Sequence, residues 1–201
     1  MLKGRAVPEF PESLPDPIEP GFAAAEREAA LERGVAVHRL LQMLPDTDPA
    51  EREDLAARWL ERQYSGWAEA DRREAVTEAM RIVGDERLAP LFAPGSRAEA
   101  GIAGNVWIGG REVLVSGQID RLAVSGDEIL LADYKTGRTS PGGPERVEEA
   151  YLLQMALYRV LLRQIYPEKA VRCLLVRTRD GTIQELDVAE MDAALASITP
   201  A

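Results

Sequence analysis

Two aspartates and a lysine near the middle of the chain have the types and spacing of a hydrolytic metal site. Asp120 ends the alternating apolar segment VLVSGQID, and Asp133 and Lys135 lie two residues apart in the next segment, ILLADYK. Side chains two residues apart in a strand point to the same face, so Asp133 and Lys135 are expected to project together. A short Ser-Gly-Asp turn joins the two segments, which predicts a hairpin that brings Asp120 within reach of Asp133.

This combination of side chains suits phosphodiester hydrolysis. Mg²⁺ prefers oxygen ligands and keeps several waters, and a lysine can polarise an attacking water or stabilise charge on the phosphorus. A simpler interpretation makes both aspartates turn residues and Lys135 an exposed strand lysine. Two observations favour the chemical interpretation. Asp133 interrupts an apolar stretch, where an unpaired charge is costly, and the chain uses only three lysines against 21 arginines.

Other polar residues are weaker candidates when each is taken alone. His38, the sole histidine, lies in a helical pattern, and a lone histidine there is more often an ordinary helix residue than a ligand. Gln154 and Tyr158 are four residues apart in another helical pattern and share a face, but a partly buried helix boundary explains them better. Glu99 could supply a further carboxylate from the preceding strand, yet a single acid does not identify a ligand.

The first half of the chain is predicted to be helical. Residues 1–20 contain five prolines, which indicates an extended linker or arm. Residues 21–95 carry apolar side chains at three- and four-residue spacing. Helices are therefore expected over residues 21–44, 48–64, 67–83 and 86–92, with Asp48 as the N-cap of the second.

From residue 96 the pattern changes to strands and one long helix. The strands, separated by glycine turns, are expected over 97–103, 105–108, 112–124, 128–134, 170–177 and 182–186, and the helix over 145–166. A short helix ends the chain. This order predicts a mixed α/β (α+β) fold with a central mixed sheet flanked by helices and a helical N-terminal region.

Composition sets limits on the class of protein. Cys173 is the only cysteine, so the chain offers no internal disulfide and no iron–sulfur cluster of several cysteines. No apolar run approaches the roughly 20 residues of a membrane span, and the N-terminus lacks the apolar region of a secretory signal. A cytoplasmic protein with no membrane partner is expected. Trp59, Trp67 and Trp107 are expected in the core.

Charge neither requires nor excludes a nucleic acid partner. The net charge of −10 opposes phosphate binding, which usually uses basic surfaces. Residues 135–179, however, carry nine basic and four acidic side chains, a local excess of five positive charges. A DNA-binding face in that stretch is therefore permitted.

Four motifs in order resemble those of the RecB-type nucleases of the PD-(D/E)xK superfamily. They are Gly34-(x)₃-His38, Gly117-Gln118-Ile119-Asp120, Asp133-Tyr134-Lys135-Thr136 and Gln154-(x)₃-Tyr158. The segments around them are most similar to the C-terminal nuclease domains of AddA subunits in bacterial AddAB helicase–nucleases, over roughly residues 30–190. Four ordered motifs are much more specific than any one of them.

The resemblance implies a role for each motif residue. His38, Asp120, Asp133 and the backbone carbonyl of Tyr134 would ligate Mg²⁺, with Mn²⁺ as a substitute, and Lys135 would be the catalytic lysine. Gln154 and Tyr158 would help to position DNA. The implied fold is restriction-endonuclease-like, with residues 21–95 as a helical region of the nuclease domain and 96–201 as its core.

The resemblance also implies an activity and partners. The expected protein is a divalent-metal-dependent deoxyribonuclease, an exonuclease rather than a sequence-specific endonuclease, that processes double-strand breaks for recombinational repair. The expected partners are DNA, a helicase motor in cis or in trans, and an AddB-like subunit. The chain has no Walker A sequence, so it is either an excised domain or a free-standing relative. The alternative is a catalytically silent DNA-guiding or scaffold module, which should have lost a motif residue; here all are present.

Overall fold

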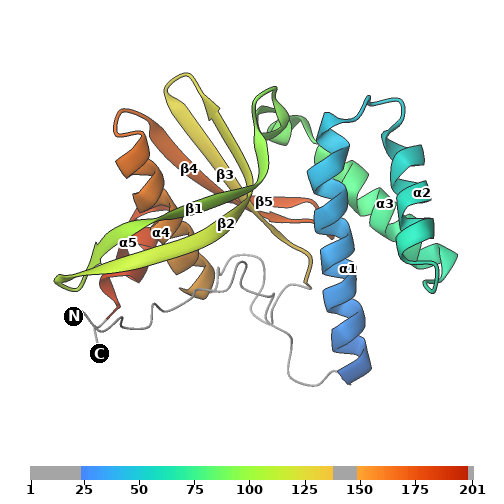
Figure 1. The fold of residues 1–201 in the computed structure, drawn as a ribbon, viewed down its shortest axis with the longest axis horizontal. Helices are drawn as coiled ribbons and strands as arrows, with labels where there is room; N and C mark the ends of the chain where they lie inside the picture. Colours follow the sequence, from blue (N-terminus) through green and yellow to red (C-terminus); the bar gives the residue numbers. More distant parts are fainter. Residues whose placement is uncertain (1–23, 138–148, 199–201) are drawn as a thin grey trace, which may run out of the picture.

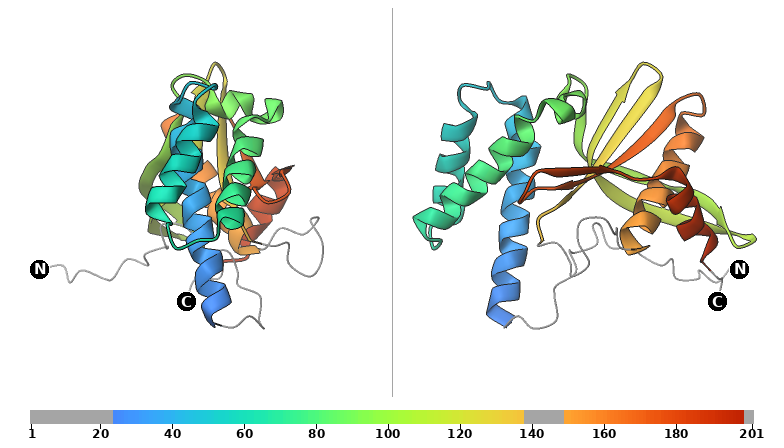
Figure 2. Two further views of the ribbon diagram at one scale, coloured as in Figure 1. Left: turned by 90° about the vertical axis from the view of Figure 1, so that its right-hand side faces the viewer. Right: turned by 180° about the vertical axis from the view of Figure 1, so that it is seen from behind.

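A computed structural model describes residues 24–137 and 149–198, which form a five-stranded sheet between two groups of helices (Figures 1 and 2). The expected mixed α/β fold with a helix-flanked mixed sheet is confirmed. The arm expected over residues 1–20 lies outside the described residues, as does the start of the helix expected from residue 145. The elements in chain order are α1 (Ala24–Met43), η1 (Leu44–Asp46), α2 (Arg52–Gln63), α3 (Glu69–Val83), η2 (Glu86–Phe92), β1 (Arg97–Ile108), β2 (Arg111–Ser125), β3 (Glu128–Lys135), α4 (Glu149–Ile165), β4 (Ala170–Arg177), β5 (Thr182–Glu185) and α5 (Val188–Ala196).

The sheet follows chain order, β1-β2-β3-β4-β5, and is antiparallel except between β3 and β4. Parallel neighbours need a crossover connection, and α4 supplies it. The C-terminal ends of β3 and β4 consequently meet at one edge of the sheet, where Lys135 is paired with Arg177. In the described part of the chain, no helix combines the length and apolarity needed to cross a bilayer.

Strand β3 is buried on both faces and divides the protein into two cores. Leu130, Ala132 and Tyr134 face α1, α3 and η2 in what we call the helical-side core. Ile129 and Leu131 face α4 and α5 in the α4-side core. Period-two alternation then places Asp133 and Lys135 on the α4 side, as the sequence predicts.

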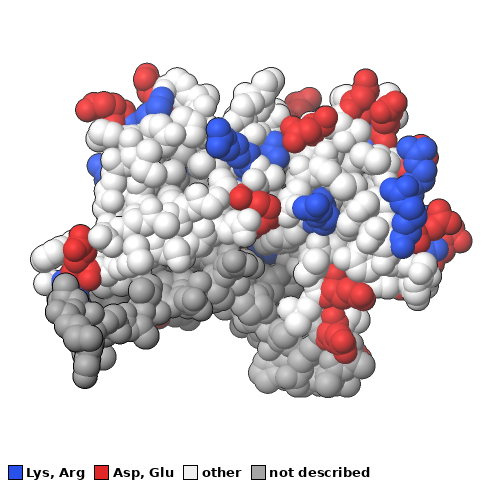
Figure 3. All heavy atoms as spheres, in the orientation of Figure 1, with Lys and Arg blue, Asp and Glu red and all other residues white. Residues whose placement is uncertain are grey.

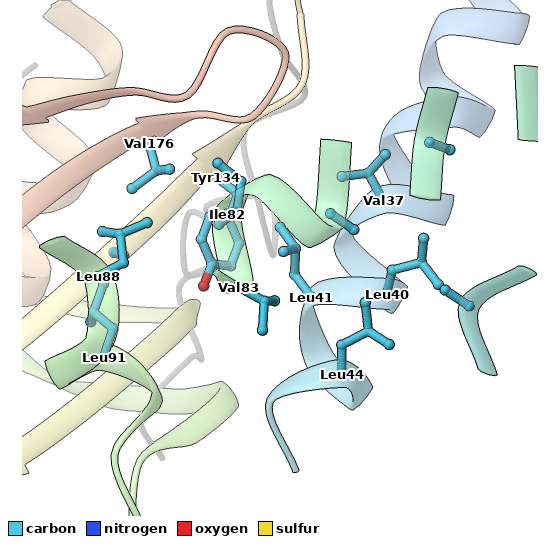
Figure 4. Packing of buried hydrophobic residues seen from close by; sticks show 14 of the residues in the cluster. Val37, Leu40, Leu41, Leu44, Ile82, Val83, Leu88, Leu91, Tyr134 and Val176 are labelled. Carbon is cyan, nitrogen blue, oxygen red and sulfur yellow. The ribbon is translucent and has the colours of Figure 1, made fainter. Parts of the chain in front are cut away.

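The helical-side core fixes α1 against the sheet. The α1 side chains at three- and four-residue spacing, Val37, Leu40 and Leu41, pack together with Leu44 of η1 against α3, η2 and the ring of Tyr134 (Figure 4). The helix also passes close to the end of β3, because a Cβ on Gly34 would lie 2.7 Å from Thr136 Oγ1. Glycine at position 34 therefore permits the approach that carries His38, one turn later, to the sheet.

Two predictions about β1 were wrong. Gly104 was expected to form a turn, but β1 continues through it. A Cβ at this position would lie 2.8 Å from Leu161 Cδ2 of α4. The glycine serves close packing against the helix rather than a reversal of the chain. Trp107 is 71% exposed on this strand, whereas Trp59 and Trp67 pack against the helical-side core.

Helix α2 starts later than expected. It begins at Arg52, and Asp48 Oδ1 instead accepts a hydrogen bond of 2.9 Å from the amide of Ala50 in the preceding turn. Helix α1 ends at Met43, and Pro45 lies within η1, the single 3₁₀ turn that follows it. These differences shift helix ends and leave the order of elements unchanged.

Strand β2 changes its facing at Asp120. Ile119 and Leu122 both pack into the α4-side core, whereas Ala123 belongs to the helical-side core and Arg121 Nε donates to the Leu91 carbonyl there, at 3.1 Å. Strict alternation would place residues 119, 121 and 123 on one face. The strand therefore switches faces between Ile119 and Arg121, and Asp120 lies at the switch.

The close approach of α4 to β2 gives a test of this packing. A Cβ on Gly117 would lie 2.1 Å from the Tyr158 hydroxyl and 2.7 Å from its ring, whereas one on Gly101 of β1 would contact nothing within 4 Å. We expect Gly117→Ala to lower the free energy of unfolding by about 1–3 kcal/mol because the buried ring cannot give way. Gly101→Ala should leave it unchanged or raise it by up to about 1 kcal/mol. Urea unfolding of both variants measures this, and equal values would contradict the packing.

Candidate active site

The four residues expected to do chemistry converge from three elements. Helix α1 supplies His38, the facing switch in β2 supplies Asp120, and the end of β3 supplies Asp133 and Lys135. The two aspartates and the lysine are all more than nine-tenths buried, and His38 is partly exposed. These three ionisable groups are therefore not residues of a solvated turn, and their burial together makes this place a candidate functional site.

His38 contacts the sheet through both ring nitrogens. Nε2 lies 3.0 Å from the carbonyl oxygen of Tyr134, and Nδ1 lies 3.8 Å from Asp120 Oδ1. The imidazole also meets the Tyr134 ring edge-on, at 5.8 Å between centroids. Adjacent ligands of an octahedral ion with bonds near 2.1 Å are about 3 Å apart, so Nε2 and the carbonyl oxygen have a spacing that fits either a hydrogen bond or two neighbouring ligands.

The surroundings of Asp120 disfavour the ionised form of its carboxyl group. Its Oδ2 accepts a 2.7 Å hydrogen bond from the amide of Tyr134. Burial raises the pKa of Asp120 from 3.8 to about 7, with a contribution from the negative charge of Asp133, while His38, the Tyr134 amide and Lys135 act in the opposite direction. A group in this state is able to exchange a proton for a cation.

Asp133 and Lys135 form a buried ion pair on the α4 side of the sheet. Asp133 Oδ2 lies 2.8 Å from Lys135 Nζ. The contact is ionic, since Oδ2 accepts no hydrogen bond of normal geometry. The ammonium also lies over the Tyr151 ring of α4, 3.8 Å from its centroid. Tyr151 was not singled out from the sequence, although it lies three residues before Gln154 and so shares its helix face.

Gln154 and Tyr158 lie beside this centre. Gln154 Nε2 donates to the Tyr158 hydroxyl at 3.2 Å, and that hydroxyl packs on Gly117, three residues before Asp120. Burial raises the pKa of Tyr158, so its hydroxyl stays protonated. The amide oxygen of Gln154 is buried and accepts no hydrogen bond. The pair is therefore a polar face of α4 turned toward the site.

A buried ion pair that sequence reasoning missed braces the end of β3. Glu78 of α3 is 3% exposed, and its carboxylate accepts hydrogen bonds from Arg33 of α1, at 2.6 Å, and from the Thr178 hydroxyl. The amide of Thr178 donates in turn to the carbonyl of Lys135 at 2.9 Å. The network ties α1 and α3 to the strand end that carries Lys135. Its members are 45 and 100 residues apart in sequence, so no local pattern could link them.

Several described basic residues of the stretch 135–179 already have acidic partners. Arg159 pairs with Asp192 at 3.1 Å, and Arg172 pairs with Glu128 and Glu185. On the face drawn in Figure 3, basic and acidic side chains are interspersed. Among the described members of the stretch, Lys135 and Arg179 are also paired with acids, so these four positive charges are offset within the fold.

Comparison with known families agrees with this geometry. The family model of the PD-(D/E)XK nuclease superfamily matches residues 14–198. The chain belongs to this superfamily. The resemblance carried by the four motifs is thereby confirmed, and the centre at Asp120, Asp133 and Lys135 lies within the matched range.

Curated relatives connect this superfamily member to helicase–nucleases. The chain is 30% identical over 198 residues to the A subunit of an ATP-dependent helicase/nuclease from Desulforudis audaxviator, covering 87% of this chain and 15% of that protein. It is 42% identical over 60 residues to the protein of the same name in Pelotomaculum thermopropionicum, covering 30% and 5%. The chain thus spans a small part of these relatives. The solved protein SSO0001 aligns with a TM-score of 0.34 at 15% identity, over 86% of this chain and 84% of that one, a likeness too weak to carry an argument.

The residues present fit the divalent metal that nucleases of this superfamily use. One imidazole, two aspartates and a backbone carbonyl converge here, and such nitrogen and oxygen donors suit Mg²⁺ or Mn²⁺. The buried carboxyl of Asp120, whose Oδ1 lies 3.8 Å from His38 Nδ1, is an oxygen donor of the kind that such an ion takes.

The raised pKa of Asp120 gives a test that needs no activity. In chelator, the folded protein holds a proton on Asp120 that the unfolded chain releases, so the stability from this carboxyl is present below pH 3.8 and is lost as the pH rises through about 7. Asp120→Asn removes this loss. From about pH 5 to about pH 8, we expect the unfolding free energy of the unsubstituted protein to fall by about 1–3 kcal/mol more than that of the variant. Parallel curves would contradict this, and Asp127→Asn, in the exposed β2–β3 turn, is the control.

Proposed function

We propose that this chain is a divalent-metal-dependent deoxyribonuclease domain that hydrolyses DNA phosphodiesters with Mg²⁺, and with Mn²⁺ as a substitute. One observation carries the proposal: His38, Asp120 and the Tyr134 carbonyl meet beside a buried Asp133–Lys135 pair. A simple structural role would not require burying these charges together.

The roles follow from the positions. His38, Asp120, Asp133 and the Tyr134 carbonyl are the metal ligands, and a cation held by them would orient a phosphate oxygen and lower the pKa of a bound water. The ammonium of Lys135 lies beside Asp133 and over the Tyr151 ring, so it can orient the attacking water and stabilise charge on the phosphorus. Gln154 offers a buried amide oxygen next to Tyr158, and this pair positions the DNA strand or the catalytic groups.

The relatives support a wider role. Their names join a helicase to a nuclease, so we infer that this domain works with a helicase motor in cis or in trans, beside an AddB-like subunit. The activity would be exonucleolytic, at double-strand breaks that are processed for recombinational repair, in the cytoplasm. The paired surface charges agree with this, since a motor that delivers DNA raises its local concentration and removes the need for tight autonomous binding.

A catalytically silent DNA-guiding module is the competing proposal. Such a module would keep the fold but would not need buried charges at the end of β3. Here the lysine and both aspartates are retained and buried together, which favours the enzyme.

The decisive measurement is cleavage of linear single- and double-stranded DNA by the purified chain. We expect cleavage with Mg²⁺ or Mn²⁺, none in chelator, and a loss of about 100-fold or more in Asp133→Ala and Lys135→Ala. Asp127→Ala and Lys169→Ala, at the opposite end of β3, are matched controls that should keep full activity. Activity that survives both site substitutions would refute the assignment.

The role of His38 is tested by cation binding rather than by cleavage. We expect His38→Ala to weaken Mn²⁺ binding by about tenfold or more in titration calorimetry, because one ligand is removed. The fold should tolerate the change, since the imidazole is partly exposed. An unchanged affinity would return His38 to the role of an ordinary helix residue.

A further inference from the structure

Glu99 of β1 lies opposite Asp120 in the β1–β2 ladder. The register pairs Ala98 with Arg121 and Ala100 with Ile119, so Glu99 and Asp120 face each other between two regular pairs. Glu99 has a φ of 49°, the one positive value among the non-glycine residues that the structure describes. This left-handed backbone is unusual for a glutamate and coincides with the facing switch in β2.

The turned backbone brings the Glu99 carboxylate to the candidate metal ligands. One ligand atom from each of Glu99, His38 and Asp120 lies within 4.8 Å of the other two. Ligands on opposite sides of an ion with bonds near 2.1 Å are about 4 Å apart, so a small movement of the partly buried Glu99 side chain would close the set around one ion.

Helix α1 holds this carboxylate in place. Gln42, one turn after His38, donates from Nε2 to Glu99 Oε1 at 2.6 Å. The orientation of the Gln42 amide is fixed from its other end, where Oε1 accepts a 2.5 Å hydrogen bond from Arg39. Glu99 therefore does not swing freely into solvent.

The charges at the site also call for a cation beside Glu99. Glu99 and Asp120 belong to one cluster, Asp133 acts electrostatically on Asp120, and one ammonium, that of Lys135, is paired with Asp133. When all are ionised, two negative charges remain unbalanced in a partly buried space, and a divalent ion would neutralise them.

We propose that Glu99 is a further ligand of the catalytic cation, held in position by Gln42. This inference rests on the proposed function, because it concerns the same cation. It adds a carboxylate from β1 to the proposed ligands from α1, β2 and β3. The positive φ of Glu99 would then serve to direct this carboxylate toward the cation.

The test is Mn²⁺ binding by the whole purified chain. Glu99→Gln keeps an acceptor for Gln42 and removes only the charge. We expect its dissociation constant for Mn²⁺ in titration calorimetry to rise about tenfold or more, and the Mn²⁺-induced increase in melting temperature to shrink in step. In chelator the melting temperature of Glu99→Gln should not fall, since a like charge beside Asp120 is lost.

Matched controls separate ligation from a structural role. Glu112→Gln, on an exposed position of the β1–β2 hairpin, should bind Mn²⁺ as the unsubstituted chain does. An affinity equal to that of Glu112→Gln, or a melting temperature lowered in chelator with the Mn²⁺ shift intact, would overturn the role of Glu99 and leave the proposed nuclease standing. Absence of Mn²⁺ binding by the unsubstituted chain would overturn the proposed metal dependence itself.

Discussion

Asp120 and Asp133 are buried close together at neighbouring strand positions, and two like charges in a poorly solvated place repel each other. The surrounding structure is arranged to make this tolerable. The amide of Tyr134 donates to Asp120, the ammonium of Lys135 lies against Asp133, and His38 approaches from α1. These contacts only partly offset the repulsion, which is why the pKa of Asp120 remains raised. In the proposed nuclease, a divalent cation would supply a counter-charge, and the energetic disadvantage of burying the two carboxylates together would contribute to its binding free energy.

Holding charges in such an unfavourable place requires rigid supports on both faces of the sheet. On one face, the helical-side core packs α1 against Tyr134, and the buried Arg33–Glu78–Thr178 network ties the strand end to α1 and α3. On the other face, α4 packs so closely that glycine is required at position 117. The helices of the first half therefore act as part of the site, because without them neither the imidazole nor the end of β3 would keep its position.

The sequence predicted what depends on local spacing. The alternation of β3 placed Asp133 and Lys135 on one face, and the apolar spacing of the helices gave their order. It could not predict what depends on the register between strands. Glu99 was named only as an acid that could supply a further carboxylate, because its place opposite Asp120 exists only once β1 and β2 have paired. Gly104 was mistaken for a turn because the same residue type serves both reversals and close helix packing. The basic stretch permitted a DNA-binding face, but a count of charges could not show that Arg159 and Arg172 have acidic partners.

Helix α1 provides His38 and Gln42, while the carboxylates belong to the sheet, so the site exists only when the helix is docked. Docking of α1 and the proposed cation binding would then be linked equilibria. The free energy by which a bound cation stabilises the docked helix equals the free energy of cation binding that is lost when the helix is displaced. In the proposed nuclease, any change that moved α1 away from the sheet would weaken cation binding without altering a carboxylate. In the described part of the chain, the contact between α1 and the sheet is thus where helix packing and the proposed cation binding are coupled.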